Sequence, residues 1–545
     1  MSQPAPPVSP ASPASPASPA SPAPPAVPAA HHPYVNPWII AISVMFATFM
    51  EVLDTTVVNV SLPHIAGSLS ASIDEATWVL TSYLVANAII LPMTGWLASV
   101  FGRKRLLMTS VVGFTASSFL CGLAPNLGSL ILFRIVQGAT GGALQPLSQA
   151  VLLEAFPPHE RGKAMGFWGQ GIVVAPILGP VLGGWLTDNY SWRWVFYINI
   201  PVGIASIVMT KLFVFDPPYL RREAGKVDYW GLGMLAVGIG ALQFVLDKGQ
   251  EEDWFASNTI TTLSIIAVCT LIALVYHELT TEHPVVDLRV FKERSYAVGV
   301  FLMTVLGFVL YGSLVLLPIM LQTLFSYPSL QAGIAMAPRG LGAFVMMQVT
   351  GQLTGRMDAR KLLAAGLVIG GMTLLWLAQL NLQAGYWDIF WPQIIQGAGM
   401  SLLFVPLTTV TMDPIPRERM GNATSLFNLM RNIGGSIGIA TTGTMLSRRA
   451  QSTTALLGRN VTSYDPAAQT MLAQLRGAFM AAGADATTAT ERAYAAMFGI
   501  VQRQATMVSF VGIFQLLGVL FVALVPLVLL MKRPGRAPSP ETAAH

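Results

Sequence analysis

The chain has 545 residues, of which 53% are hydrophobic and only 10% are charged, with a formal net charge of +5. Soluble globular chains carry about 25% charged residues, so this composition excludes an ordinary soluble domain and indicates a polytopic membrane protein. Both cysteines, Cys121 and Cys269, lie in apolar runs, which excludes a disulfide framework and a CxxC metal site.

Residues 1–35 differ from the rest of the chain, because they are dominated by repeats of Ala, Ser and Pro. Proline lacks a backbone donor and the segment has few apolar side chains to bury, so we expect a disordered cytoplasmic tail. No Lys or Arg precedes Arg103, whereas a cleaved secretory signal begins with basic residues. We therefore expect an inert tether rather than a signal, with a tail that binds a partner as the alternative.

Apolar windows of about 20 residues mark membrane helices, and fourteen of them follow in chain order. Lys and Arg gather in the loops after the even-numbered spans, so the positive-inside rule places these loops and both termini in the cytoplasm. The segment 447–506 then lies outside. The predicted spans are 38–61, 77–99, 106–124, 128–153, 163–186, 193–214, 229–247, 259–278, 296–320, 331–354, 361–380, 391–412, 421–446 and 507–531.

The first span contains two carboxylates, Glu51 and Asp54, which share a helix face because they are three residues apart. A rise of about 1.5 Å per residue puts both past the middle of the bilayer, toward the outside. Low dielectric disfavours a charged carboxylate, and intramembrane acids are often functional. We predict that both acids are proton-coupling residues; neutral acids that make structural hydrogen bonds are the alternative.

The loop after the second span contains Gly95, Gly102 and Arg103 in the pattern GWLASVFGRKR. This pattern resembles a loop signature of major facilitators, except that Ser99 replaces its acidic residue. The resemblance implies a conformational, gating role for the two glycines and the arginine, without a carboxylate at position 99. A basic cluster that serves topology alone is the alternative.

The fourth span carries Arg134 inside its apolar window, where a bare guanidinium is costly. The stretch LFRIVQG resembles the arginine signature of proton-driven exporters. This resemblance implies that Arg134 influences proton transfer with acids across the cavity. A structural arginine that ties the span to its neighbours is the alternative.

The fifth span contains Gly179, Pro180, Gly183 and Gly184. Glycines on one stripe let helices approach closely, and proline permits a bend. The GPxxGG pattern, with Gly166 upstream, resembles the antiporter motif of exporters, which implies a conformational role and export rather than import. Tight helix packing alone is the alternative.

Substrate cavities are mostly apolar with few polar groups, so polar or aromatic residues within spans are candidates to bind substrate. Two further arginines, Arg339 and Arg431, also lie within spans. Each arginine could pair with an acid or contact an anionic group; we expect a structural acid partner for Arg339, with an anionic ligand as the alternative, whereas both stay equally open for Arg431. The substrate-binding candidates are Tyr83, Asn87, Gln137, Gln145, Gln170, Tyr311, Gln348, Phe427, Asn428 and Arg431.

The chain also contains an internal repeat. RIVQGA at 134–139 recurs as QIIQGA at 393–398, and the loop at 95–105 has an echo at 351–361, at offsets of 256 to 260 residues. A parallel repeat of six spans predicts sites between two six-helix halves. We therefore predict an all-α major facilitator fold, with six-helix bundles at 36–215 and 286–533, two inserted helices at 216–285 and a cytoplasmic tail at 534–545.

From about residue 36 to 533 the chain resembles the EmrB/QacA-type fourteen-span drug:proton antiporters of the major facilitator superfamily, and most of all the EmrB-like members. LDTTVVNVSLP, TWVLTSYLVANAIILPMTGWLA and WPQIIQGAGMSLLFVPLTT carry the resemblance. It implies multidrug efflux, the proton-driven export of hydrophobic or amphipathic toxic compounds, by alternating access across the bacterial inner membrane. It also implies a periplasmic adaptor of the EmrA type and a TolC-like outer-membrane channel.

Several alternatives stay open. Within the segment 447–506 the stretch DPAAQTMLAQLRGAFMAAGADATTATERAYAAM is predicted to be an amphipathic, weakly helical region, which could dock such an adaptor or only cover the outer mouth. The exported compound could be one specific metabolite, siderophore or fatty acid, and a membrane channel is an alternative of another class. The sequence has no P-loop, nucleophile motif or metal-ligand spacing, so we expect no enzyme, cofactor, metal or nucleic acid; the proton gradient is the expected energy source.

Overall fold

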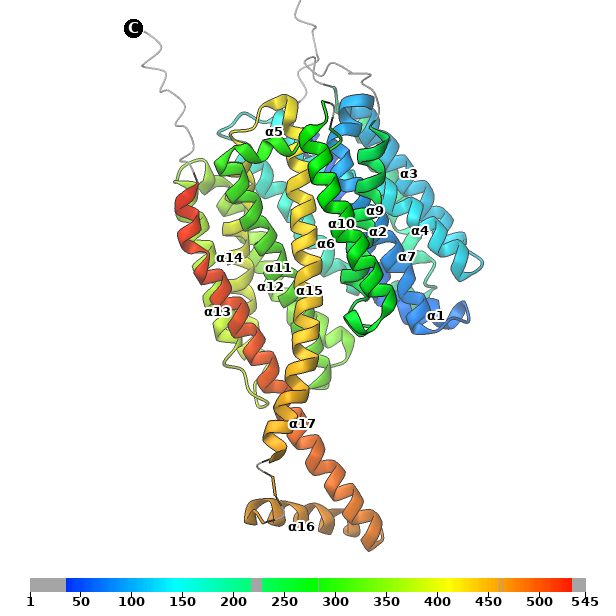
Figure 1. Cartoon of the computed structure of the whole chain (residues 1–545), viewed down its shortest axis with the longest axis vertical. Helices are drawn as coiled ribbons and strands as arrows, with labels where there is room; N and C mark the ends of the chain where they lie inside the picture. Colours follow the sequence, from blue (N-terminus) through cyan, green and yellow to red (C-terminus); the bar gives the residue numbers. More distant parts are fainter. Residues whose placement is uncertain (1–35, 217–227, 283, 460, 463, 532–545) are drawn as a thin grey trace, which may run out of the picture. The chain divides into compact units, whose positions relative to one another are not determined.

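The computed structural model describes residues 36–216 and 228–531, apart from 283, 460 and 463, as helices with short connections (Figure 1). This described part contains no strand, and the predicted tails 1–35 and 534–545 lie outside it. The helices are α1 (Pro37–Ser68), α2 (Ile73–Phe101), α3 (Arg103–Leu123), α4 (Leu127–Gly141), α5 (Leu144–Ala155), α6 (Arg161–Asn189), α7 (Trp194–Tyr197), α8 (Asn199–Phe213), α9 (Tyr229–Lys248), α10 (Asn258–Thr280), α11 (Arg294–Thr323), α12 (Ser329–Thr354), α13 (Ala359–Leu377), α14 (Tyr386–Met412), α15 (Met420–Arg459), α16 (Pro466–Ala481) and α17 (Ala486–Ala523), with short 3₁₀ helices η1 (Trp254–Ala256), η2 (Leu288–Lys292), η3 (Arg417–Arg419) and η4 (Val525–Leu530).

Local side-chain contacts fix where helices begin. α2 starts with a capping box, in which the Ser72 hydroxyl accepts from the Glu75 backbone N–H at 3.2 Å and the Glu75 carboxylate accepts from the Ser72 N–H at 2.8 Å. α4 starts at Asn126, whose side chain accepts from the Ser129 N–H at 2.9 Å. These contacts satisfy backbone donors that the first helical turn leaves unpaired.

Thirteen helical segments of the described part are long and apolar enough to cross a membrane. They correspond to thirteen of the fourteen predicted spans. The remaining span is α15, whose buried face carries polar residues such as Thr424, Asn428 and Arg431, and these lower its hydropathy. α15 is nevertheless a continuous helix of 40 residues, so the predicted order of fourteen helices is present.

Two predicted spans are broken helices. The fourth divides into α4 and α5, and the sixth divides into α7 and α8. Near the first break α4 lies against α2: a Cβ atom on Gly138 would lie 2.3 Å from the Tyr83 carbonyl oxygen, and one on Gly142 would lie 2.6 Å from that of Asn87. Only glycine permits this approach, which brings polar side chains of α4 close to α2.

The helices pack as two halves with an inserted pair (Figure 1). In the first half α1 packs against α5, α6 and α8, and α4 packs against α2 and α3; in the second half α15 packs against α11, and α14 packs against α12 and α13. The halves meet where α6 contacts α12 and where α2 and α5 contact α15. α9 packs against α10, α2 and α15, so the inserted pair lies beside the junction of the halves.

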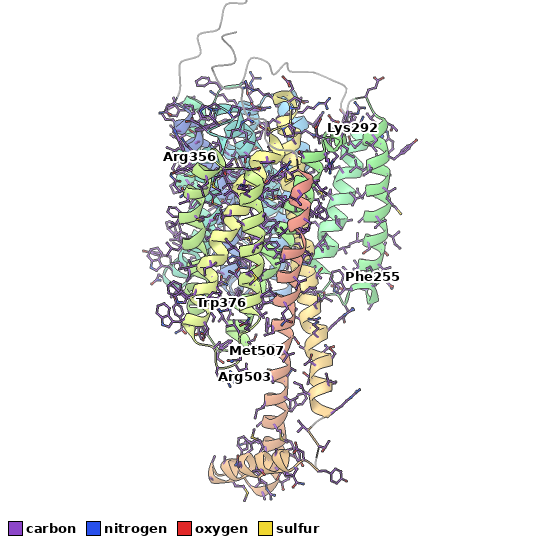
Figure 2. All side chains as sticks on the ribbon, turned by 90° about the vertical axis from the view of Figure 1, so that its left-hand side faces the viewer. Phe255, Lys292, Arg356, Trp376, Arg503 and Met507 are labelled. Atoms are coloured by element: carbon purple, nitrogen blue, oxygen red, sulfur yellow. The ribbon has the colours of Figure 1, made fainter. Side chains whose placement is uncertain are left out.

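The predicted loop 447–506 is mostly helical. α15 continues beyond its apolar window, α17 begins well before the last one, and α16 packs against α17. The segment is rich in alanine, which favours helix. Figures 1 and 2 show α16 at the opposite end of the spans from Lys292 and Arg356.

Candidate functional site

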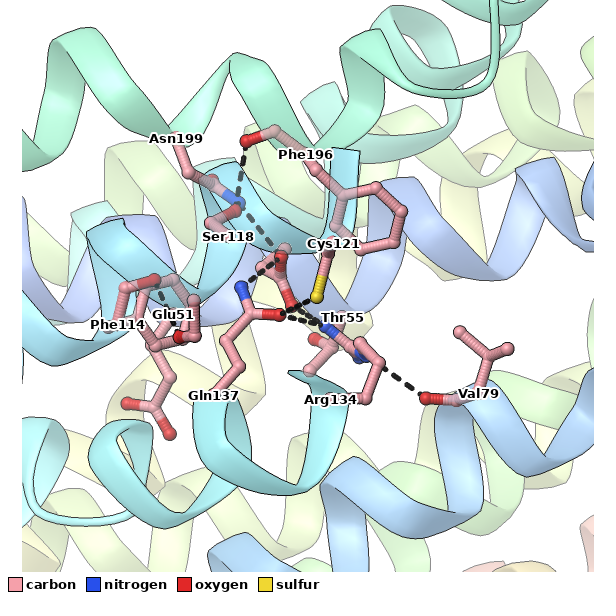
Figure 3. A network of polar contacts seen from close by, with 12 residues as sticks. Glu51, Thr55, Val79, Phe114, Ser118, Cys121, Arg134, Gln137, Phe196 and Asn199 are labelled. Atoms are coloured by element: carbon pink, nitrogen blue, oxygen red, sulfur yellow. Dashed lines mark hydrogen bonds and ion pairs between the residues drawn. The ribbon is translucent and has the colours of Figure 1, made fainter. Parts of the chain in front are cut away.

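A buried polar network in the first half connects Asp54 on α1 with Arg134, Gln137 and Asn199, and Figure 3 labels the last three residues. Asp54 Oδ2 lies 2.6 Å from Arg134 Nη1, and both side chains are fully buried. Asp54 Oδ1 accepts hydrogen bonds from Gln137 Nε2 at 3.0 Å and from Asn199 Nδ2 at 2.8 Å. Three donors, one of them cationic, therefore hold this carboxylate inside the helix bundle.

Arg134 on α4 is itself held from several sides. Its Nε donates to the Val79 carbonyl oxygen at 3.0 Å, and its Nη1 donates to Gln137 Oε1 at 2.8 Å. The guanidinium carbon lies 4.1 Å from the centroid of the Tyr83 ring, which is a cation–π distance. The sequence predicts a link between Arg134 and an acid, and in the structure that acid is Asp54.

The network joins five helices: α1, α2, α3, α4 and α8. Gln137 follows Arg134 by one helical turn, so α4 presents both side chains on one face. Asn199 begins α8 and donates to Ser118 Oγ on α3 at 3.0 Å as well as to Asp54. Sequence reasoning missed Asn199 and Ser118, because neither belongs to a motif. The only signal is an amide side chain within an apolar span.

Glu51 precedes Asp54 by one turn but has different partners. Its side chain is buried, and its Oε1 accepts from Asn87 Nδ2 on α2 at 3.0 Å. Its Oε2 is buried without a hydrogen-bond partner, and none of the ion pairs found among the described residues includes it. The two predicted proton-coupling acids thus have separate hydrogen-bond partners, and Glu51 has an oxygen open to a proton or a polar ligand.

Several predicted substrate-binding residues meet at the junction of the halves. Arg431 on α15 donates to Gln145 Oε1 on α5. Asn428, one turn earlier on α15, donates to Gln149 Oε1 at 2.6 Å. Gln149 was not predicted, although it lies one turn after Gln145 and shares its face of α5. These contacts connect the two halves through amide and guanidinium groups.

Buried polar atoms at this junction lack hydrogen-bond partners in the described part. Buried polar groups are normally paired, so such a cluster indicates a place for polar ligand atoms or water. Two further candidates, Asn87 and Phe427, are also buried on α2 and α15. The unpaired atoms at the junction are Glu51 Oε2, Gln149 Nε2, Asn428 Oδ1 and Arg431 Nε, whereas the unpaired Tyr83 OH lies inside the first half, beside Gly141.

The remaining substrate candidates lie elsewhere. Gln170 Nε2 on α6 donates to the Phe344 carbonyl oxygen on α12 at 2.9 Å, and thus joins the halves. The Tyr311 ring packs on Gly435, where a Cβ atom would lie 2.5 Å from it. Gln348 is exposed among exposed apolar neighbours of α12, so the structure does not bring it to the junction.

Gly95 in α2 and Gly102 directly after it occupy positions where a side chain does not fit. A Cβ atom on Gly95 would lie 2.6 Å from the Asn422 Cα atom of α15, so backbone meets backbone between the halves. Gly102 has φ +85°, and a Cβ atom there would lie 2.8 Å from Asp216 Oδ2. Both positions fit the predicted conformational role, which stays a prediction.

Arg103 forms an ion pair with Glu154 at the end of α5, and both side chains are largely buried. Its Nη2 also donates to the Arg417 carbonyl oxygen at 3.3 Å, which links the first half to the second. The acid missing at Ser99 is therefore not needed for Arg103 to have a carboxylate partner. Glu154 was not predicted, although it is an acid at the end of an apolar span.

The glycines of the fifth span pack α6 against α1. A Cβ atom on Gly179 would lie 2.1 Å from Thr56 Oγ1, and one on Gly183 would lie 2.9 Å from the Val57 carbonyl oxygen. Gly184 has no neighbour within 4 Å of such an atom. The side chain of Pro180 lies outside the described residues.

Arg339 departs from expectation. The sequence predicts a structural acid partner, but no carboxylate in the described part pairs with it, and its hydrogen bonds go to Ser313 Oγ alone, at 3.4 Å. The predicted pairing is therefore wrong for this part of the chain. The two acids of the first span lie on α1 in the other half, and Asp54 is bonded to Arg134 there. Neither acid is therefore a partner of Arg339 on α12.

Comparison with known proteins places the chain in a family. The Major Facilitator Superfamily matches residues 44–439. The chain is 42% identical over 439 residues to the multidrug export protein EmrB of Haemophilus influenzae, covering 80% of this chain and 86% of that protein. It is 39% identical over 504 residues to the fatty acid resistance protein FarB of Neisseria gonorrhoeae, covering 91% and 96%. It is 30% identical over 505 residues to the colistin resistance protein EmrB of Acinetobacter baumannii, covering 92% and 97%.

Solved structures share the fold. The human organic anion transporter MFSD10 has a TM-score of 0.56 at 12% identity, covering 89% of this chain and 99% of that chain. The proton:xylose symporter XylE has a TM-score of 0.54 at 16% identity, covering 76% and 90%. The predicted fold of two six-helix bundles with two inserted helices is thus confirmed. The chain belongs to the Major Facilitator Superfamily and, within it, to the EmrB-type transporters.

Proposed function

We propose that the protein exports hydrophobic or amphipathic toxic compounds across the bacterial inner membrane in exchange for protons, by alternating access of its two halves. Relatives named for multidrug export and colistin resistance support efflux. The observation that carries proton coupling is the pair of buried acids on α1. Asp54 is bonded to Arg134, and one turn away Glu51 has an unpaired oxygen near the junction.

The two acids have different parts in the proposed cycle. Protonation of Asp54 weakens its bond to Arg134 and its contacts with Gln137 and Asn199, which loosens α1 from α4 and α8. Glu51 carries a proton beside the substrate, because its open oxygen lies among the unpaired polar atoms of the junction. Protons enter from outside as substrate leaves, and their release into the cytoplasm restores the Asp54–Arg134 pair.

Transport in proteoliposomes with an imposed pH gradient tests this proposal. We expect gradient-driven movement of ethidium by the parent, at least a tenfold loss in Asp54→Asn and a smaller loss in Glu51→Gln. Arg356→Gln is the matched control, because Arg356 is an exposed arginine beyond α12. Full gradient-driven transport by Asp54→Asn would refute the role of Asp54.

We further propose that both termini are cytoplasmic and that α16 lies in the periplasm. The positive loops that hold Lys292 and Arg356 lie at the opposite end from α16 (Figure 2), which supports this orientation. Tyr464 is 91% exposed beside α16. In a variant with Cys121 and Cys269 replaced by Ser, Tyr464→Cys should react with an impermeant maleimide on intact spheroplasts; reaction only in inverted vesicles would contradict the orientation.

We also propose that α16 docks a periplasmic adaptor of the EmrA type, which connects the protein to a TolC-like channel. No residue of α16 is buried, so the helix is accessible to a partner. Co-purification of an EmrA-type adaptor should require residues 466–481. An adaptor that binds equally well without this segment would refute the docking role and favour a simple cover over the outer mouth.

A second candidate function is export of one class of amphipathic acid. The relative FarB, named for fatty acid resistance, shares 39% identity over 504 residues. Competition with ethidium transport discriminates the two candidates. A broad exporter is inhibited by many apolar compounds, whereas an acid exporter is inhibited by long-chain carboxylates alone.

A further inference from the structure

Arg339 lies in the interior of the second half, and no described residue provides it with an anionic partner. Its side chain is 9% exposed. Nη1 and Nη2 each lie 3.4 Å from one oxygen, Ser313 Oγ on α11, which is longer than the usual range of about 2.7–3.2 Å. The Ser313 hydroxyl donates its own proton to the Leu310 carbonyl oxygen at 3.0 Å, so its oxygen is left as a neutral acceptor.

The surroundings of Arg339 contrast with those of Arg134, another buried span arginine. Arg134 has a carboxylate at 2.6 Å, a backbone carbonyl and an amide oxygen. Arg339 has none of these among the described residues. A buried charge without a partner is costly, and a guanidinium fork matches a carboxylate with two parallel hydrogen bonds. Arg339 therefore offers an anion site that no side chain fills.

A second arginine of this half also has no ion pair with an acid in the part of the chain that the structure describes. Arg431 contacts amide oxygens of Gln145 and Asn432, and its Nε is unpaired. α11 relates the two arginines: a Cβ atom on Gly307 would lie 2.3 Å from the Arg431 carbonyl oxygen, and Ser313 follows six residues later, about 9 Å along the helix. The second half thus presents two arginines where the first presents two acids.

We propose that Arg339, with Ser313, binds the anionic head group of a carboxylate-bearing amphipathic molecule. The inference rests on the proposed export function and assigns a substrate class to its second half. The carboxylate of this molecule offers Arg339 two anionic oxygen atoms in place of the single neutral oxygen of Ser313. The apolar tail of the molecule lies among the span helices. A structural arginine and an arginine that holds a lipid phosphate are the competing roles.

The test uses the purified full chain in nanodiscs of phosphatidylethanolamine, with dodecanoate as the probe and 1-dodecanol as the neutral probe of equal length. Binding is measured by calorimetric titration, and the unfolding temperature is measured without probe. The variants are Arg339→Gln and Arg339→Lys. The control is Arg356→Gln, an exposed arginine on the cytoplasm-facing end in the proposed orientation (Figure 2).

We expect the parent to bind dodecanoate at least tenfold more tightly than dodecanol. Arg339→Gln should weaken dodecanoate binding about tenfold to hundredfold, the range for a charge-assisted contact, and leave dodecanol binding unchanged. It should not lower the unfolding temperature, since it removes an unpaired buried charge. Arg339→Lys should restore part of the affinity, and Arg356→Gln should match the parent.

Three results would overturn the inference. If Arg339→Gln binds dodecanoate as tightly as the parent, Arg339 is not the binding site. If Arg339→Gln has a lower unfolding temperature and binds neither dodecanoate nor dodecanol, the arginine is structural. Nanodiscs that contain phosphatidylglycerol separate the lipid role: Arg339-dependent stabilisation by this lipid, without dodecanoate binding, also overturns the proposal. Failure of the export function is distinct, because gradient-driven transport of both ethidium and dodecanoate is then absent although dodecanoate still binds.

Discussion

The buried ion pair of Asp54 and Arg134 should contribute to stability as a unit. Arg134→Met leaves a fully buried carboxylate with two amide donors and no cation, and breaking such a pair costs about 3–5 kcal/mol. Asp54→Asn leaves the arginine without an anion and should cost about 3 kcal/mol, since the new amide oxygen still accepts a hydrogen bond. The double variant removes both charges and should cost no more than either single change.

The free energy of unfolding in mixed micelles, followed by tryptophan fluorescence, gives the coupling in this double-mutant cycle. We expect about 3 kcal/mol or more of coupling between Asp54 and Arg134. The matched control is the pair of Glu160 and Lys163, which lie 3.8 Å apart with side chains 36% and 47% exposed; its coupling should be below about 0.5 kcal/mol. Additive costs within about 0.5 kcal/mol at Asp54 and Arg134 would refute the reasoning.

Three further predictions test other contacts. Gly95→Leu should abolish ethidium transport in a protein that still inserts, because even its Cβ atom would lie 2.6 Å from Asn422 Cα; normal transport would show that this approach of the halves is dispensable. Asn199→Leu removes a 2.8 Å donor to Asp54 and should lower the unfolding free energy by about 1.5–3 kcal/mol. Gln348→Leu should leave transport and stability within about 0.5 kcal/mol of the parent, since this side chain is exposed; a marked loss of transport would place it in the substrate path after all.

Most of the fold could be predicted from the sequence, because a membrane span is an uninterrupted apolar window. α15 was also predicted, although it is too polar to belong to the thirteen segments that are long and apolar enough to cross a membrane. The segment 447–506 was expected to be only weakly helical, whereas the structure shows α16 and long extensions of α15 and α17 there. The helices of this segment depend on the high helix propensity of alanine and on packing of α16 against α17. Neither of these produces an apolar window in the sequence.

The site was only partly predictable. Asp54 and Arg134 were found because charged residues stand out in apolar spans. Asn199 and Gln149 were missed, since amides are common enough in spans that only the folded arrangement shows which ones face an acid or another half. Gln348, also predicted as a lining residue, has an exposed side chain, and its role in substrate binding stays a prediction. Whether a polar residue of a span faces the cavity depends on how the helix is rotated about its axis, and this rotation depends on packing against neighbouring helices.

Substrate-induced proton release tests the central claim, exchange of substrate for protons at Asp54 and Glu51, most directly. The purified chain is placed in weakly buffered detergent solution with a pH indicator, and ethidium is added while its binding is followed by fluorescence. We predict that ethidium releases protons from the parent and from Arg356→Gln, and that release is lost in the double variant Asp54→Asn, Glu51→Gln. Binding of ethidium by the parent without proton release, or unchanged release from the double variant, would contradict the account.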